Sequence, residues 1–183
     1  MSESLIIQGE TKSERYAELA SQLHSLLAGE ADMIARMANV AGALKEAFDW
    51  WWVGFYRVIG NQLVLGPYQG PIACTRIAYN RGVCGTAWAQ KQTIIVPDVE
   101  QFPGHIACSS LSRSEIVVPI LINNEVIGVL DIDSEQINMF DEIDEKCLEE
   151  IVQIINNSLK KLLRLATFFY IIISVCSLIR FFS

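Results

Sequence analysis

The stretch that decides the fold is Trp50–Val58, WWWVGFYRV, which consists largely of aromatic and β-branched residues. This composition is typical of a β-strand. Gly60-Asn61 follows directly as a turn signal, and Gln62–Leu65 then predicts the returning strand of a hairpin. The pairs Gly66-Pro67 and Gly70-Pro71 predict that the chain leaves this hairpin for a loop.

The first strand would carry aromatic rings on both of its faces. Alternation predicts two sets of side chains, Trp50, Trp52 and Tyr56 on one face and Trp51, Val53 and Phe55 on the other. One face has to be core. The other presents indole and phenol groups, which suits an apolar ligand, although core packing accounts for most of these rings equally well.

Helical periodicity flanks the strands on both sides. Apolar residues recur at helical spacing over Ser13–Leu27 and again after Asp32, a residue that can cap the second helix. A last helix starts at Asp141 and carries a long apolar stripe. Between them, Arg81–Gln90 is typical of a short helix and Thr93–Val96 of a short strand.

A second hairpin lies in the C-terminal half. Glu115–Leu121 and Val126–Ile132 predict its two strands, joined at Asn123-Asn124. The polar segment Asp98–Ser114 before it is long for a loop in a compact domain, which favours a functional role. Two hairpins with helices at both ends predict an α+β domain, in which helices pack on one face of an antiparallel sheet.

Composition excludes several classes of protein. The 183 residues are enough for one domain with a core of its own, and 51% hydrophobic against 19% charged residues excludes a disordered chain. The net charge of −7 would repel a phosphate backbone, so we expect no nucleic-acid partner. His24 and His105 are isolated in the sequence, which excludes a multi-histidine metal centre.

The N-terminus contains no basic region followed by an apolar core, so we expect no secretory signal and a cytoplasmic location. Thiols stay reduced in that compartment, and an odd number of cysteines, five, also argues against a static disulfide framework. The cysteines are then buried hydrophobes, metal ligands or catalysts.

The C-terminal tail differs in composition from the rest. Leu165–Ile179 is uncharged, and its fifteen residues fall short of the ~20 that span a bilayer. We expect a domain over residues 1–163 and a separate tail over 164–183. A short membrane anchor, a helix in a dimer interface and a non-native tail all stay open, and membrane association is expected only if the tail anchors.

The cysteines divide by position. Cys147 lies on the stripe of the last helix and Cys176 in the apolar tail, which favours buried hydrophobes. Cys74 lies among loop-forming residues, and Cys84 lies in the first turn of a predicted helix, where the macrodipole favours a thiolate.

Cys108 lies in the long polar loop near His105 and Arg113, which could lower the pKa of its thiol. Three unrelated thiols remain an equal alternative on spacing alone. A zinc site made of Cys74, Cys84, Cys108 and His105 is a weaker one, because no close CxxC pair is present.

Acidic residues form a second candidate cluster. Asp131 and Asp133 lie two apart in a predicted strand and so point to the same face, and Glu115 begins the neighbouring strand. Adjacent acids would raise one another's pKa, provide a proton donor and attract a ligand ammonium. The alternative is two solvated acids at a strand end, with Asp133 capping a turn. Thiols, acids and an aromatic face together suit a small zwitterionic, partly apolar substrate that undergoes thiol chemistry.

Several segments taken in order resemble one enzyme family. The segments are WWWVGFY, GPYQGPIACTRI, RGVCGTAW, IIVPDVEQFPGHIACSS, SRSEIVVPI and VIGVLDIDS. They resemble the free methionine-(R)-sulfoxide reductases, enzymes built on a GAF domain, and the likeness extends over Tyr16–Leu159. VIGVLDIDS is common to many GAF modules, whereas the three cysteines in these contexts are specific.

The resemblance implies a single GAF domain with a six-stranded antiparallel sheet, often as a homodimer, that acts on free L-methionine-(R)-sulfoxide. It implies that Cys108 is the catalytic cysteine, Cys74 the resolving cysteine and Cys84 an auxiliary thiol, with the order of Cys74 and Cys84 open. No cofactor or metal is implied, and thioredoxin would restore the thiols in a response to oxidative stress.

The substrate-binding residues that the resemblance implies are the aromatic pair and the acids: Trp52, Tyr56, Glu115, Asp131 and Asp133. A non-enzymatic GAF sensor of small molecules is the main alternative, and it would not need the thiols. A protein defined by anchoring or interaction through its tail is a further alternative.

Overall fold

The computed structural model describes residues 5–106 and 110–156. Its helices and strands in chain order are α1 (Lys12–Leu26), α2 (Met33–Phe48), β1 (Trp52–Ile59), β2 (Gln62–Gln69), β3 (Arg76–Ala78), α3 (Gly82–Gln90), β4 (Ile94–Val96), the 3-10 turn η1 (Val99–Gln101), β5 (Ser114–Ile122) and β6 (Glu125–Ser134). A further helix runs through residues 142–156. The predicted boundary at residue 163 and the apolar tail lie outside the described residues.

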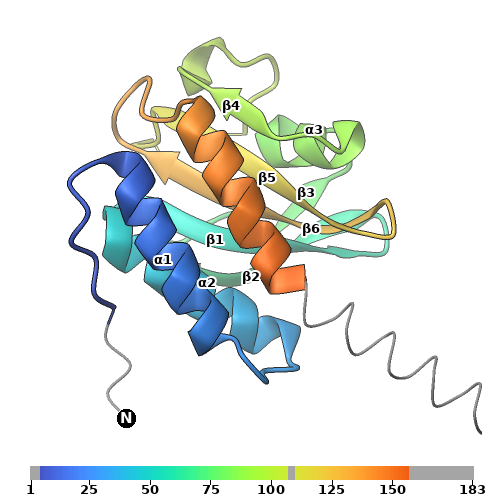
Figure 1. Cartoon of the computed structure of the whole chain (residues 1–183). Coiled ribbons are helices and arrows are strands. Elements are labelled where there is room, and N and C mark those ends of the chain that lie inside the picture. Colours follow the sequence, from blue (N-terminus) through green and yellow to red (C-terminus); the bar gives the residue numbers. More distant parts are fainter. Residues whose placement is uncertain (1–4, 107–109, 157–183) are drawn as a thin grey trace, which may run out of the picture.

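The strands form one six-stranded sheet in the order β3-β2-β1-β6-β5-β4 (Figure 1). Every neighbouring pair in it is antiparallel. The two predicted hairpins, β1-β2 and β5-β6, are present, and β1 pairs with β6 to join them at the centre of the sheet. The predicted α+β fold with an antiparallel sheet is confirmed.

Strand β2 continues through Gly66-Pro67, where the sequence predicted a loop. Gly54 pairs with Tyr68 and Tyr56 pairs with Leu65, so one residue of β1 faces two residues of β2. This irregularity is a β-bulge, a position at which a strand tolerates proline because the ladder hydrogen bond is already interrupted. The loop prediction was wrong because the bulge depends on the partner strand.

The two faces of the sheet carry different cores. The first core joins α1, α2 and the 142–156 helix to side chains of β1, β5 and β6, as predicted for the helices near both ends of the domain (Figure 1). Helix α3 packs on the second face, where it contacts β3, β4, β5 and β6. Asp32 caps α2 as predicted, since its Oδ1 accepts hydrogen bonds from two backbone N–H groups, those of Ile34 and Ala35.

The predicted alternation of the tryptophans holds only inside β1. Trp52 and Tyr56 lie in the second core, whereas Trp50 lies in the first core with Val53 and Phe55. Trp51 packs against the second core. The strand begins at Trp52, so its period of two does not extend back to the two preceding residues.

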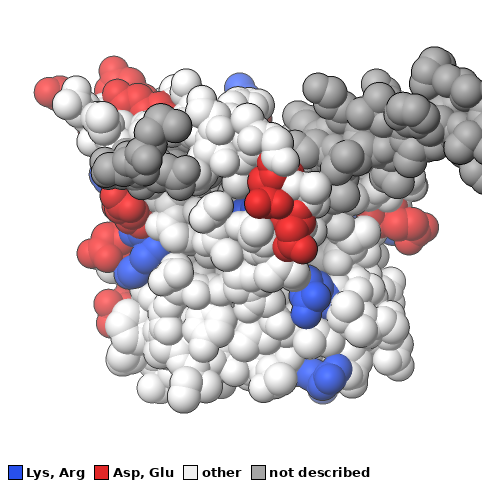
Figure 2. All heavy atoms as spheres, turned by 90° about the horizontal axis from the view of Figure 1, so that it is seen from below, with Lys and Arg blue, Asp and Glu red and all other residues white. Residues whose placement is uncertain are grey.

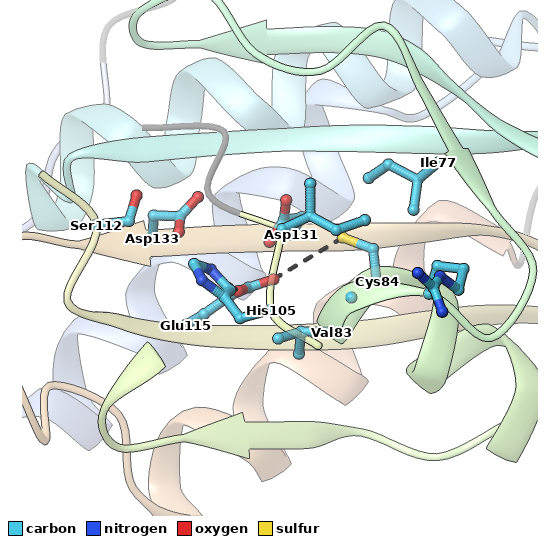
Figure 3. Close-up of a pocket in the computed structure, with 11 residues that line it drawn as sticks. Ile77, Val83, Cys84, His105, Ser112, Glu115, Asp131 and Asp133 are labelled. Carbon is cyan, nitrogen blue, oxygen red and sulfur yellow. Dashed lines mark hydrogen bonds and ion pairs between the residues drawn. The ribbon is translucent and has the colours of Figure 1, made fainter. Parts of the chain in front are cut away.

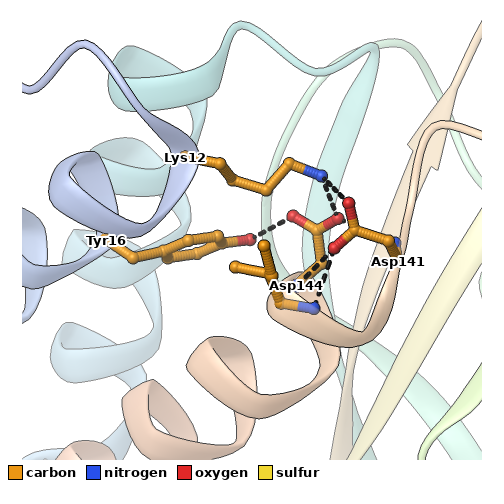
Figure 4. A network of polar contacts seen from close by, with 5 residues as sticks. Lys12, Tyr16, Asp141 and Asp144 are labelled. Carbon is orange, nitrogen blue, oxygen red and sulfur yellow. Dashed lines mark hydrogen bonds and ion pairs between the residues drawn. The ribbon is translucent and has the colours of Figure 1, made fainter.

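A polar network fastens α1 to the start of the 142–156 helix (Figure 4). Lys12 Nζ lies 2.8 Å from Asp141 Oδ2 and 2.6 Å from Asp144 Oδ2, and the Tyr16 hydroxyl donates to Asp144 Oδ1 at 2.8 Å. The Asp144 side chain is 1% exposed. A carboxylate buried to this extent needs its cationic partner.

The surface is mixed in charge. On the face that Figure 2 shows, basic side chains are few and separated among the described residues, which agrees with the net charge of −7. Over residues 5–106 and 110–156, the structure contains no helix with the length and apolar character needed to cross a membrane.

We expect Lys12→Met to lower the free energy of unfolding by about 1–3 kcal/mol, because Asp144 would stay buried without its cation. Urea denaturation at neutral pH measures this change. Lys91→Met is the matched control, since it removes an exposed ion pair with an N···O distance of 3.9 Å. That control should shift stability by less than about 0.5 kcal/mol. Equal losses in both variants would contradict the role given to the network.

Candidate functional site

The sheet register brings the three predicted acids together on its second face. Glu115 in β5 lies directly opposite Asp133 in β6, and Asp133 in turn lies opposite Trp52 in β1. Asp131 shares the face of Asp133 because side chains two residues apart in a strand point the same way. Figure 3 shows all three acids beside one cavity.

Helix α3 adds Cys84 to these acids. The Cys84 thiol donates a hydrogen bond to Glu115 Oε1 over 3.9 Å (Figure 3). The sulfur and one oxygen each of Glu115 and Asp131 lie within 4.8 Å of one another. Burial, followed by the neighbouring carboxyl groups, raises the pKa of Cys84 well above its usual range. The expectation that the helix macrodipole favours a thiolate was wrong, because desolvation and the acids dominate here.

Burial is likewise the main cause of the pKa shifts of the three acids. It is the main cause that raises the pKa of Glu115 and Asp131 well above the usual range, and the adjacent carboxyl groups raise it further. Burial raises the pKa of Asp133, and a hydrogen bond from Ser112 lowers it. Burial has the larger effect, so the pKa of Asp133 is raised to about 6. Among the described residues, Asp131 Oδ1 is buried without a hydrogen-bond partner.

Two polar side chains from the long loop complete this cavity. His105 Nε2 lies 3.8 Å from Glu115 Oε2, and burial lowers the pKa of His105. This shift weakens the contribution that His105 could make to a positive charge near Cys108, but Cys108 lies outside the described residues, so the effect of His105 and Arg113 on its thiol stays a prediction. Ser112 was missed, because nothing in the sequence distinguishes it from the other serines of the loop.

The aromatic pair lies at the other end of the acids. Trp52 stacks on Tyr68 with ring centroids 5.4 Å apart and on Tyr56 at 6.1 Å. Its Nε1 donates to the carbonyl of Pro71 at 3.1 Å, and the Tyr56 hydroxyl donates to the carbonyl of Cys74 at 3.0 Å. These bonds hold the segment after β2 against the sheet.

Two glycines make room for the Trp52 indole. A Cβ added at Gly54 would lie 2.3 Å from Trp52 Cη2, and one at Gly70 would lie 2.6 Å from Trp52 Cδ1. Gly70 also has a backbone φ of +141°, which residues with a side chain rarely adopt. The ring therefore fits between two positions that only glycine can fill.

Two small cavities flank the acids. The first, of about 30 Å³, lies between α3, the acids and His105. The second, of about 20 Å³, lies between the acids, Trp52, Tyr56 and residues 71–73. Both are lined by Ser112, Asp131 and Asp133. Each has room for about one water molecule, so an amino acid would have to part their walls.

The cysteines differ in state. Cys74 is disulfide-bonded, whereas Cys84 and Cys147 are free thiols, so neither of these two is its partner. A disulfide sulfur is no thiolate ligand, which removes Cys74 from the zinc set considered above. Cys147 packs against the first core from the 142–156 helix, as expected of a small hydrophobe.

Comparison with known proteins identifies the family to which this chain belongs. The GAF domain profile matches residues 30–160. The chain belongs to the GAF domain family. It is 59% identical to GAF domain-containing protein A of Dictyostelium discoideum, over 86% of this chain and 100% of that protein. It is 48% identical to the free methionine-R-sulfoxide reductase of Escherichia coli, over 77% of this chain and 86% of that protein.

Solved GAF structures agree with this relationship. The free methionine-R-sulfoxide reductase of Neisseria meningitidis, solved in complex with its substrate, matches with a TM-score of 0.83 and 51% identity. The match covers 85% of this chain and 94% of that chain. The family resemblance predicted from the sequence is therefore confirmed.

We expect Asp133→Asn to stabilise the protein more at neutral than at acidic pH. The pKa of Asp133 is raised on folding to about 6, so its contribution to stability is present at low pH and is lost as the pH rises towards 6. Between about pH 4 and about pH 7, the difference in unfolding free energy between variant and wild type should grow by about 1–2 kcal/mol.

Urea denaturation across this pH range measures the difference. The exposed Glu135, just after β6, provides the control variant Glu135→Gln, which should show no comparable growth. A constant difference between Asp133→Asn and wild type would contradict the burial of this acid.

Proposed function

We propose that this chain reduces free L-methionine-(R)-sulfoxide to L-methionine. The proposal is supported by the relatives that carry the name of this activity. The observation that carries it is the row of acids, the buried Glu115 and Asp131 and the half-buried Asp133, that runs from the free thiol of Cys84 to the Trp52–Tyr56 pair. The acids of this row could bind the charged end of one amino acid, and the aromatic pair could bind its apolar end.

Each part of the substrate has a matching surface. The methylthio end would pack against Trp52 and Tyr56, whose rings are apolar and held in place by hydrogen bonds. The ammonium group and the sulfoxide oxygen would lie among Glu115, Asp131 and Asp133. The unpartnered oxygen of Asp131 is suited to accept a hydrogen bond from the ammonium. A peptide nitrogen carries no positive charge and cannot replace the ammonium there.

The reaction begins with the thiol predicted to be catalytic. Cys108 as thiolate attacks the sulfoxide sulfur, and one of the three acids protonates the oxygen, which a neutral sulfoxide would not otherwise release. The protonated oxygen then passes to Cys108 Sγ, and both the sulfur–oxygen bond of the substrate and the sulfur–sulfur bond formed in the attack break. Methionine departs as the reduced thioether, and Cys108 is oxidised to a sulfenic acid.

Recycling uses the second thiol. Cys74 condenses with the sulfenic acid to give a disulfide and one water molecule, and the auxiliary thiol Cys84 can exchange into that bond. A cytoplasmic dithiol protein of the thioredoxin type then reduces the disulfide and is oxidised itself. The disulfide-bonded state of Cys74 is consistent with this role. The cycle calls for no metal or organic cofactor.

We expect reduced wild-type protein to form about one methionine per chain when mixed with the (R)-sulfoxide in the absence of reductant, because one thiol pair stores one reduction. Cys74→Ser should give the same single turnover and then stall with thioredoxin present. Cys108→Ser should form none. Chromatographic quantification of methionine measures all three.

Cys147→Ser is the control, since this thiol lies on the other side of the sheet, and it should match the wild type. Active Cys108→Ser would show that the attacking thiol is misassigned. If wild-type protein binds the sulfoxide without consuming it, the chain is a sensor and the proposed function fails.

A further inference from the structure

We propose that Cys84, Glu115 and Asp131 form a site for one thiophilic divalent metal ion, Zn²⁺ or Cd²⁺, and that metal bound there excludes the substrate. The first part stands on the geometry of these three side chains alone. The second part rests on the proposed function, because it assigns the same acids to the substrate.

The distances suit a metal of this size. Cys84 Sγ and Glu115 Oε1 lie 3.9 Å apart, and one ligand atom from each of the three residues fits within 4.8 Å. Zinc bonds of ~2.3 Å to sulfur and ~2.0 Å to oxygen place these atoms about 3.5 Å apart in a tetrahedron. The Cys84–Glu115 pair would have to close by about 0.4 Å and the pairs that involve Asp131 by at most about 1.3 Å, which side-chain rotation can supply.

Asp131 provides a second observation that points to a cationic ligand, and because the proposed function assigns the same oxygen to the substrate ammonium, metal and substrate would compete for it. Its side chain is 6% exposed, and its Oδ1 has no hydrogen-bond partner among the described residues. The adjoining cavity of about 30 Å³ is bounded by all three side chains. It has room for about one water-sized species, so an ion held among the three side chains could take one water molecule from the cavity as fourth ligand, whereas an amino acid would not fit.

The surroundings support a cation at this point. His105 Nε2 lies 3.8 Å from Glu115 Oε2, whereas Cys84 contacts Oε1, so His105 could hold the carboxylate as outer-shell partners of metal ligands do. Arg81, the other basic residue that lines the cavity, is exposed and can turn to solvent. Metal binding would displace the proton of Cys84 and any protons held by the two acids. The resulting thiolate and two carboxylates favour Zn²⁺ or Cd²⁺ over Mg²⁺, which avoids sulfur.

Cobalt(II) chloride added to the full-length protein tests the site, because sulfur bound to Co²⁺ gives a charge-transfer band in the near ultraviolet. The protein is used without reductant, so that Cys74 stays in its disulfide and cannot bind the metal. We expect one equivalent of Co²⁺ to produce the band in wild type. Cys84→Ser should abolish it, and Asp131→Asn should weaken binding at least about tenfold.

Cys147→Ser is the matched control and should bind Co²⁺ within about twofold of wild type. Glu115→Gln provides a second oxygen-ligand variant should Asp131→Asn fail to fold, and circular dichroism verifies the fold of each. A band that persists in Cys84→Ser, unchanged affinity in a folded Asp131→Asn or Glu115→Gln, or no band in wild type would overturn the site.

Competition tests the second part. Zn²⁺ should raise the KM for the (R)-sulfoxide in wild type, and saturating methionine should weaken Co²⁺ binding at least about fivefold, since mutual exclusion is reciprocal. Metal binding without any turnover would refute the proposed function and leave the site intact. Normal turnover without metal binding would refute the metal site and leave the proposed function intact. Independent binding of metal and methionine would refute exclusion alone.

Discussion

Strand β6 imposes the constraint on which the site depends. It pairs with β1 on one side and β5 on the other, so its alternate side chains are covered by neighbours on both edges. Asp131 and Asp133 fall on the face that also holds Trp52 and Tyr56. Two carboxyl groups, joined by Glu115 from the next strand, are thereby kept out of water in an apolar surface. Removing them from water costs free energy, which a cationic ligand can offset by pairing with them.

The opposite face of the sheet makes this cost tolerable. There α1, α2 and the 142–156 helix cover the strands with a large apolar core, beside which these helices also bury Arg36, Asp144 and Asn156. Burial of that core supplies the hydrophobic stabilisation on which the fold relies. The second face is only partly covered by α3 and by the loops, and it holds the acidic and polar side chains of the candidate site. Fold and site are thus assigned to different faces of the same strands.

Local patterns predicted much of this arrangement from the sequence. Period two in a strand is local, so the common face of Asp131 and Asp133 could be predicted, and the hairpin turn between β5 and β6 then placed Glu115 beside them. Features that depend on distant residues were predicted wrongly. Pro67 lies inside a strand because β1 accommodates a bulge there. The pKa of the Cys84 thiol is raised rather than lowered because helix α3 buries it among acids that lie far away in the sequence.

The central claim is that the buried acids select a substrate with a free ammonium group. The ratio of kcat/KM for free L-methionine-(R)-sulfoxide to that for its N-acetyl derivative measures this selectivity most directly. Acetylation removes the positive charge and leaves the sulfoxide unchanged. We predict a ratio of at least about 100, because the acids would lose their charged partner. Equal kcat/KM values for the two compounds would contradict the account.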